Sequence, residues 1–385
     1  MNKKKSIRIS LGAPYYDKNE VQRVTAVLKS GWLTQGPQVQ EFEKKVAEYI
    51  GVKHAIAVFN GTCALHTILF ALGIKNGDEV LVPSFTYVAT ANAVVYQNAQ
   101  PVFVDIDLKT LNIAPKDIEK KITKHTKGVI CVHYGGLPAN MEAISNISKE
   151  HDLFVIEDAA EAIGSIYKGI RVGSFGTAAV FSFHAQKVIT TGEGGVITTN
   201  DGDLADRCRE IRDHGRDLKT KRFVCLGYNY RMTEMQAALG IEQLNKIETI
   251  IQRRIANANY LTKHLSALNE ITPPFVPPDT RHTFMLYTIR VPQNRDALLK
   301  FLNAKGIESK IYFNPVHLEP YYAQAFGRQW SLPTTEAMSK QVLSVPVHAK
   351  LTHEELDWII ECVFNFYAKQ QPKKEIPIGT EISLG

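Results

Sequence analysis

The stretch FVIEDAAEAIGSIYKGIRVGSFGTAAVFSFHAQKVITTGEGGVITT, residues 154–199, decides the fold. It contains apolar, β-branched runs of the kind that form strands covered on both faces. These runs are residues 154–158, 179–183 and 195–199. Four similar runs precede them, at residues 54–59, 79–83, 101–106 and 128–134. Stretches with helical spacing, such as residues 63–72 and 141–150, separate several of the runs. This alternation predicts an α/β fold around a mostly parallel, seven-stranded sheet.

Helical patterns flank this region on both sides. Asp17 and Glu20 have the spacing of a capping box and predict a helix over residues 18–30. Thr233 has the chemistry of an N-cap, and the helical pattern that follows it runs to about residue 268.

A change of composition marks the C-terminal part of the chain. Four prolines fall within residues 273–278, which indicates a boundary between structural units. The runs beyond it predict strands at 287–291 and 308–313, and helices near 295–305 and from about 353. We therefore expect a large α/β domain over residues 1–250 and a small α+β domain over residues 251–385.

Composition limits the class of protein. The 385 residues include 45 Lys+Arg and 39 Asp+Glu, a formal net charge of +6, and 44% are hydrophobic, which excludes disorder as the main state. The positive charge is spread along the chain apart from residues 3–5, so steering of small anions explains it as well as nucleic-acid binding does. The five cysteines form no CxxC pair, as is typical of reduced thiols, and we see no apolar signal core and no run long enough to span a membrane. We expect a cytoplasmic protein that binds neither nucleic acid nor a membrane.

Two polar segments follow predicted strands, where ligands of open α/β sheets bind. Residues 54–59 lead into Asn60-Gly61-Thr62 and directly into a helix, an arrangement that suits a phosphate group. Taken alone, an ordinary capped turn explains this segment better. Asp158 ends the apolar run 154–158. A carboxylate buried there needs a cation or a hydrogen-bond donor as its partner. A helix cap explains Asp158 equally well on its own.

Lys187 is the most informative residue of the chain. Most lysines are solvated, but Lys187 lies in a glycine-rich turn between two predicted buried strands. An amine in such a place is able to lose its water and attack a carbonyl. The segment 192–194 is not a dinucleotide fingerprint, because a strand follows it, and the histidines show no metal-binding spacing, so we expect no metal. Together with the phosphate cradle, Lys187 and Asp158 predict a site for pyridoxal phosphate (PLP), with the lysine as Schiff base and the acid paired with the ring nitrogen.

The sequence resembles the PLP-dependent sugar-nucleotide aminotransferases of the DegT/StrS type, over nearly the whole chain. The motifs that carry this resemblance are GWLTQGP (31–37), NGTCALH (60–66), PSFTYVATAN (83–92), EDAAEAIG (157–164), SFHAQK (182–187), GEGG (192–195) and GYNYRMTEMQAA (227–238). The resemblance implies aminotransferase fold type I and an active homodimer with its sites at the interface.

The resemblance also implies a role for each matching residue. Lys187 holds the cofactor and then moves the proton between the substrate carbon and the cofactor, and Asp158 pairs with the ring nitrogen. Tyr87 stacks on the ring, and Glu161 lies near the ring hydroxyl. The residues implied to hold the phosphate are Gly61, Thr62, Ser182 and, from the other subunit, Asn229. Without the resemblance, core packing of Tyr87 and a turn role of Asn229 would be favoured. The chain departs from the family at Val188, often Asn, and at Glu161, often Gln.

The run IESKIYFNPVHLEPYY, residues 307–322, looks more like the 4-aminotransferases of the GDP-perosamine synthase type than like enzymes that act at C3. We expect amino transfer from glutamate to C4 of a nucleotide-linked 4-keto-6-deoxyhexose, as in the synthesis of amino sugars for lipopolysaccharide O-antigen. The candidate side chains for binding this substrate and its diphosphate are His184, Arg231 and His317. A PLP-dependent dehydratase or lyase on the same fold is an alternative. Some relatives have His in place of the lysine and are sugar dehydratases, so the lysine of this chain favours amino transfer. A non-catalytic regulatory protein is a further alternative.

Overall fold

The computed structural model describes residues 8–326 and 330–368. Its main sheet has seven strands in the order β1-β9-β8-β5-β4-β2-β3. These are β1 (His54–Val58), β2 (Glu79–Pro83), β3 (Gln100–Val104), β4 (Thr126–Val132), β5 (Phe154–Asp158), β8 (Ala178–Ser182) and β9 (Gly195–Thr199). Neighbouring strands are parallel except that β9 runs antiparallel to β1 and β8. The predicted α/β fold with a mostly parallel seven-stranded sheet is confirmed.

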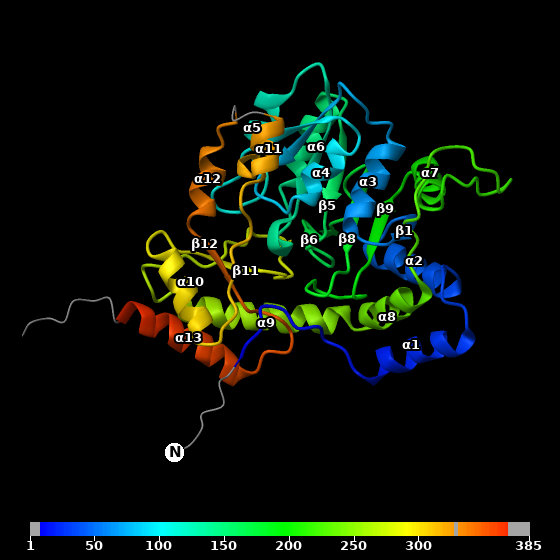
Figure 1. The fold of residues 1–385 in the computed structure, drawn as a ribbon. Helices are drawn as coiled ribbons and strands as arrows, with labels where there is room; N and C mark the ends of the chain where they lie inside the picture. The colour runs from blue at the N-terminus through cyan, green and yellow to red at the C-terminus, as the bar shows by residue number, and fades with distance from the viewer. Residues whose placement is uncertain (1–7, 327–329, 369–385) are drawn as a thin grey trace, which may run out of the picture.

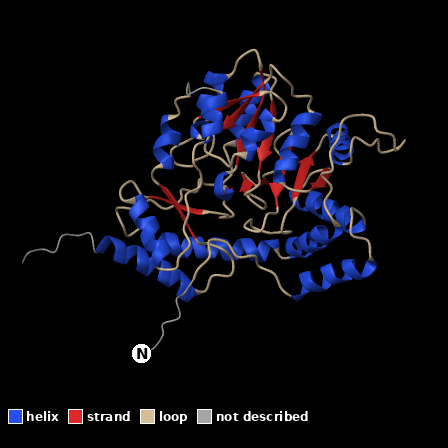
Figure 2. Cartoon of the chain, in the orientation of Figure 1, coloured by secondary structure: helices blue, strands red, loops and turns tan. Residues whose placement is uncertain are grey.

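Helices cover both faces of this sheet (Figures 1 and 2). They are α2 (Pro37–Ile50), α3 (Gly61–Ala71), α4 (Ala89–Val95), α5 (Pro115–Lys121), α6 (Met141–Glu150), α7 (Gly202–Arg212) and α8 (Glu234–Asn245). Val180 of β8 packs into a core with α3, α4 and α7, whereas its neighbour Phe181 packs into a second core with α2 and α8. Each strand is thus buried on both sides, which explains why its sequence is almost continuously apolar.

The helices at the lower edge of Figure 1 follow the predicted caps. Asp17 is the N-cap of helix α1 (Lys18–Ser30) and forms the capping box with Glu20. The long pattern after Thr233 forms two helices, α8 and α9 (Ile247–Leu265), which are separated at Lys246. The Lys246 amine contacts both Asp17 and Glu20, at 2.7 and 2.8 Å, and so ties this junction to the start of α1.

A smaller antiparallel sheet pairs β11 (Tyr287–Arg290) with β12 (Val342–Val345) and packs with α9, α10 (Arg295–Ala304) and α13 (His353–Ala368). The strand predicted at 308–313 is wrong, because in the described structure this segment pairs with β12 only through a bridge between Lys310 and Ser344. Tyr312 and Phe313, at the end of this segment, instead line a cavity at the large sheet. The remaining strands and α-helices of the described residues are β6 (Ile166–Tyr167), β7 (Ile170–Arg171), β10 (Thr280–Arg281), α11 (Pro320–Ala325) and α12 (Pro333–Ser339). Among the helices of the described ranges, none has the length and apolar character needed to cross a bilayer.

Candidate active site

A cavity of about 490 Å³ lies beyond the carboxyl ends of β5 and β8. Because these two strands are neighbours and parallel, the loops that follow them lie at the same edge of the sheet. Eight residues singled out from the sequence line this cavity: Gly61, Thr62, Tyr87, Asp158, Glu161, Ser182, His184 and Lys187. The fold therefore brings most of the predicted site into one space.

The N-terminus of α3 forms one wall of the cavity. The side chain of Asn60 accepts a hydrogen bond from the N–H of Cys63 at 2.9 Å, and the first N–H groups of a helix have no acceptor within the helix. A Cβ atom at Gly61 would lie 3.2 Å from the Cβ of Ser182, so a side chain there would occupy the space between α3 and the end of β8. A phosphate group fits this open helix terminus.

Asp158 is buried beside this wall at the end of β5, with 6% of its surface exposed. Its Oδ2 accepts a hydrogen bond from the Thr90 hydroxyl at 2.8 Å, and its Oδ1 accepts one from the N–H of Ala160 at 3.2 Å. The pKa of Asp158 is raised above its ordinary value, and burial is the largest cause. The two hydrogen bonds and the charge of Lys187 act in the opposite direction but do not cancel this rise. A carboxylate offers about four acceptor positions, so room remains for the N–H of a positively charged ring nitrogen.

Lys187 and Glu161 lie next to each other in the wall of the cavity. The Nζ atom of Lys187 lies 3.4 Å from Oε1 of Glu161, and their side chains are 17% and 7% exposed. The other carboxylate oxygen of Glu161 accepts the N–H of Gly135 at 2.8 Å. The amine thus lines the cavity beside a carboxylate that a backbone N–H holds in place.

Tyr87 and His184 lie at the more exposed side of the cavity. Tyr87 is 63% exposed, and its ring centroid lies 6.3 Å from that of Phe313. An open aromatic face beside a cavity is suited to stacking on a planar ring. His184 is also exposed, with its Nε2 4.0 Å from the Glu193 carboxylate.

Three residues singled out from the sequence are not among those that line this cavity in the described chain. Asn229 lies in the exposed loop after α7, where its backbone pairs with that of Asp213. Arg231 forms an ion pair of 2.5 Å with Asp213. His317 is buried; its Nδ1 lies 2.6 Å from the Ser84 hydroxyl oxygen, which accepts a hydrogen bond from the backbone N–H of His317.

The cavity also contains residues that the sequence did not single out. Thr86 and Thr90 hydrogen-bond each other at 2.9 Å and lead to Asp158. Thr86 precedes α4 and Thr90 lies in its first turn, and their position just after the predicted strand at 79–83 was a usable signal that both lie near the site. Tyr312 and Phe313 had no such signal, because their segment has the pattern of a strand.

Known proteins resemble this chain over nearly its full length. The DegT/DnrJ/EryC1/StrS aminotransferase family matches residues 14–364. The GDP-perosamine synthase of Caulobacter vibrioides is 44% identical over 360 residues, covering 92% of this chain and 96% of that protein. Helicobacter pylori PseC, an aminotransferase involved in the biosynthesis of pseudoaminic acid, has a TM-score of 0.90 and 31% identity, covering 94% of this chain and 100% of that one. Spr1654 of Streptococcus pneumoniae, solved in its PLP form, has a TM-score of 0.89 and 28% identity, with 94% and 99% covered. The chain is therefore an enzyme of the DegT/DnrJ/EryC1/StrS aminotransferase family.

Proposed function

We propose that this enzyme uses PLP to transfer an amino group from glutamate to C4 of a nucleotide-linked 4-keto-6-deoxyhexose. The observation that carries the proposal is the amine of Lys187 in one cavity with the buried carboxylate of Asp158 and the open helix terminus at Gly61. The similarity to a GDP-perosamine synthase supports the sugar substrate, and the PLP form of a relative supports the cofactor.

When bound, PLP supplies an aldehyde that an amine attacks and a ring that withdraws electrons from the attached carbon. The residues present fit this group. Gly61, Thr62 and Ser182 would hold its phosphate, Asp158 would hold a proton on its ring nitrogen, and Tyr87 would cover its face.

Lys187 is the proton carrier in this proposal. In the first half of the reaction, its free amine takes a proton from the carbon that bears the amino group of the donor. In the second half, the amine delivers a proton to the sugar carbon that receives the amino group. Glu161, at 3.4 Å, keeps the amine directed into the cavity, and the low exposure of both side chains limits exchange with water.

A groove of about 630 Å³ continues from the cavity and supports a substrate larger than an amino acid. The groove and the cavity share Thr86, Tyr87, Tyr312 and Phe313. The groove is also lined by Tyr321, which is 56% exposed and does not line the cavity. Aromatic faces stack with nucleobases, so the sugar would lie in the cavity and the nucleotide along the groove.

A homodimer is part of the proposal. The loop after α7 stands out from the body of the molecule in Figure 1. Four of its apolar side chains are exposed. These are Leu218, Phe223, Val224 and Leu226, between 36% and 72% exposed. Exposed apolar patches are typical of protein interfaces. If a second copy packs against this loop, Asn229 and Arg231 of the loop lie near the cavity of that second copy. Sedimentation tests this contact: wild type should be a dimer, and Phe223→Asp should shift it toward the monomer.

A panel of nucleotide-linked keto-sugars, assayed with glutamate, tests the function. We expect one 2-oxoglutarate for each aminated sugar, with the 4-keto-6-deoxyhexoses as the best acceptors and 3-keto sugars as poor ones. Loss of water or another group from the keto-sugar, with no amino group retained in the product and no 2-oxoglutarate formed in proportion to it, would instead identify a dehydratase or lyase.

A further inference from the structure

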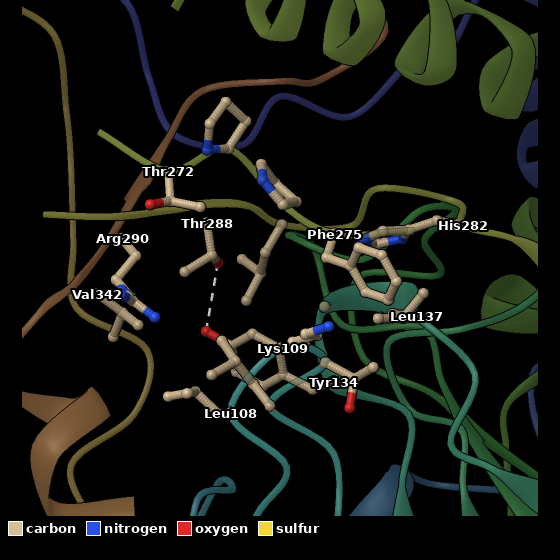
Figure 3. A pocket seen from close by; sticks show the side chains of 16 residues that line it. Leu108, Lys109, Tyr134, Leu137, Thr272, Phe275, His282, Thr288, Arg290 and Val342 are labelled. Atoms are coloured by element: carbon tan, nitrogen blue, oxygen red, sulfur yellow. Dashed lines mark hydrogen bonds between the residues drawn. The ribbon is translucent and has the colours of Figure 1, made fainter. Parts of the chain in front are cut away.

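A second cavity, of about 360 Å³, lies between loops of the large sheet and the smaller sheet (Figure 3). Its walls come from residues 108–111, from the segment after β4, and from residues 272–290 together with Val342. Its apolar lining residues are Leu108, Leu111, Leu137, Pro273, Pro274, Phe275, Leu286 and Val342. Among the residues that the structure describes, none lines both this cavity and the active-site cavity.

The charged side chains that line this cavity are cations, and no acidic residue is among the described lining residues. The Lys109 amine lies 5.7 Å from the centroid of the Phe275 ring. The Nε of Arg290 is buried and has no hydrogen-bond partner within residues 8–326 and 330–368. A buried N–H without an acceptor costs free energy, so this cavity favours a ligand that brings an anionic acceptor. Figure 3 shows both side chains among the residues that surround the space.

Residues 134 and 135 lie between the two cavities. The Tyr134 hydroxyl donates a hydrogen bond to the carbonyl of Tyr312, which lines the active site, and lies 3.2 Å from the Thr288 hydroxyl (dashed in Figure 3). The N–H of Gly135 donates to Glu161 at 2.8 Å, and the other oxygen of Glu161 faces Lys187. A shift of the Tyr134–Gly135 segment therefore moves a group that contacts the reactive amine.

We propose that this second cavity is a regulatory site for a small molecule with an apolar body and one carboxylate, and that its occupancy alters the surroundings of Lys187 through Gly135 and Glu161. The planar guanidinium of Arg290 matches a carboxylate with two hydrogen bonds, and Lys109 adds a second positive charge. The apolar body of the ligand packs against Phe275 and Leu108, which are 44% and 49% exposed without it.

Binding of a matched pair of probes to the PLP-bound enzyme tests the site. Calorimetry should detect saturable binding of 4-phenylbutyrate but not of 4-phenylbutylamine, which has the same apolar body and the opposite charge. Arg290→Met and Lys109→Met should each weaken binding of the carboxylate about tenfold, because each removes a charged partner. Lys116→Met, at an exposed lysine outside the cavity, should bind like wild type.

Equal binding of the two probes, unchanged affinity in both variants, or displacement of the carboxylate by glutamate would overturn the site. Lys109 is exposed, so its substitution remains informative if the Arg290 variant fails to fold. The coupling predicts that 4-phenylbutyrate shifts the visible absorbance of the bound cofactor in wild type and not in Arg290→Met. Binding without this shift would overturn the regulatory role. Since binding is measured without amino transfer, failure of the keto-sugar assay would leave this result intact.

Discussion

The hydroxyl of Thr90 donates a hydrogen bond of 2.8 Å to Oδ2 of Asp158. The Thr86 hydroxyl lies 2.9 Å from that of Thr90, and both threonines are buried. A connected pair of hydroxyls thus reaches from the segment after β2 to the carboxylate at the end of β5. This arrangement fixes the orientation of the acid before any ligand binds.

Thr90→Val should lower kcat about tenfold, with little change in the KM for glutamate, because the substitution removes the donor that orients Asp158. Thr90→Ser retains the hydroxyl and should recover most of the activity. The matched control is Thr67→Val, since the Thr67 hydroxyl is buried and has no hydrogen-bond partner in the described part of the chain. Steady-state formation of 2-oxoglutarate measures all three variants, and a wild-type kcat for Thr90→Val would contradict the positioning role.

A second prediction concerns stability. Glu234, at the start of α8, accepts hydrogen bonds from the N–H groups of Gly36, Gln38 and Val39 at the start of α2, at 2.8–2.9 Å. Glu234 is 3% exposed, and Gly36 has no capping side chain of its own. Glu234→Ala would leave three N–H groups without this acceptor and should lower the free energy of unfolding by about 3 kcal/mol.

Urea denaturation measures this loss. The control is Glu48→Ala, because Glu48 is 64% exposed and pairs with Lys44 at 3.9 Å. An exposed pair of this kind contributes less than about 0.5 kcal/mol. Similar losses in the two variants would show that the cap on α2 is unimportant.

The third prediction concerns acid stability and His282. Burial lowers the pKa of His282 to about 3, and the ring stacks on Phe284 at 3.9 Å. In the unfolded chain this pKa is about 6.5, so below pH 6.5 the unfolded state binds a proton that the folded state excludes. The stabilising contribution of His282 is therefore present above pH 6.5 and is lost as the pH falls toward 3, by about 1.4 kcal/mol per pH unit.

Between pH 7.5 and pH 5, the free energy of unfolding should fall by about 2 kcal/mol less in His282→Asn than in wild type. Urea denaturation at the two pH values gives the difference. His125→Asn, at an exposed histidine, should keep the dependence of wild type. A His282→Asn protein with the same loss as wild type would refute the assignment.

The sequence predicted the large sheet and the centre of the site because both depend on short-range patterns. The run that ends in Asp158 is apolar throughout, and a parallel pair of strands places the loops after β5 and β8 side by side. In an α/β sheet, the loops that follow parallel strands lie at the same edge, so Lys187 and Asp158 are expected to lie close together.

The features that the sequence did not predict depend on contacts between distant segments. His317 binds Ser84, 233 residues away, and this contact buries the histidine away from the cavity. The segment 308–313 has the pattern of a strand, but in the described structure it pairs with β12 only at Lys310. The cap that Glu234 supplies to α2 spans 195–198 residues, and no local pattern indicates it.

The central claim is that the amine of Lys187 binds PLP beside Asp158. The most direct measurement is the visible absorbance of the purified protein with PLP, followed by borohydride reduction and mass analysis of its peptides. The claim predicts visible absorbance and a cofactor-labelled peptide at Lys187 in wild type and in the exposed control Lys53→Ala, and neither in Lys187→Ala. The same absorbance and an equal label at another lysine in Lys187→Ala would contradict it.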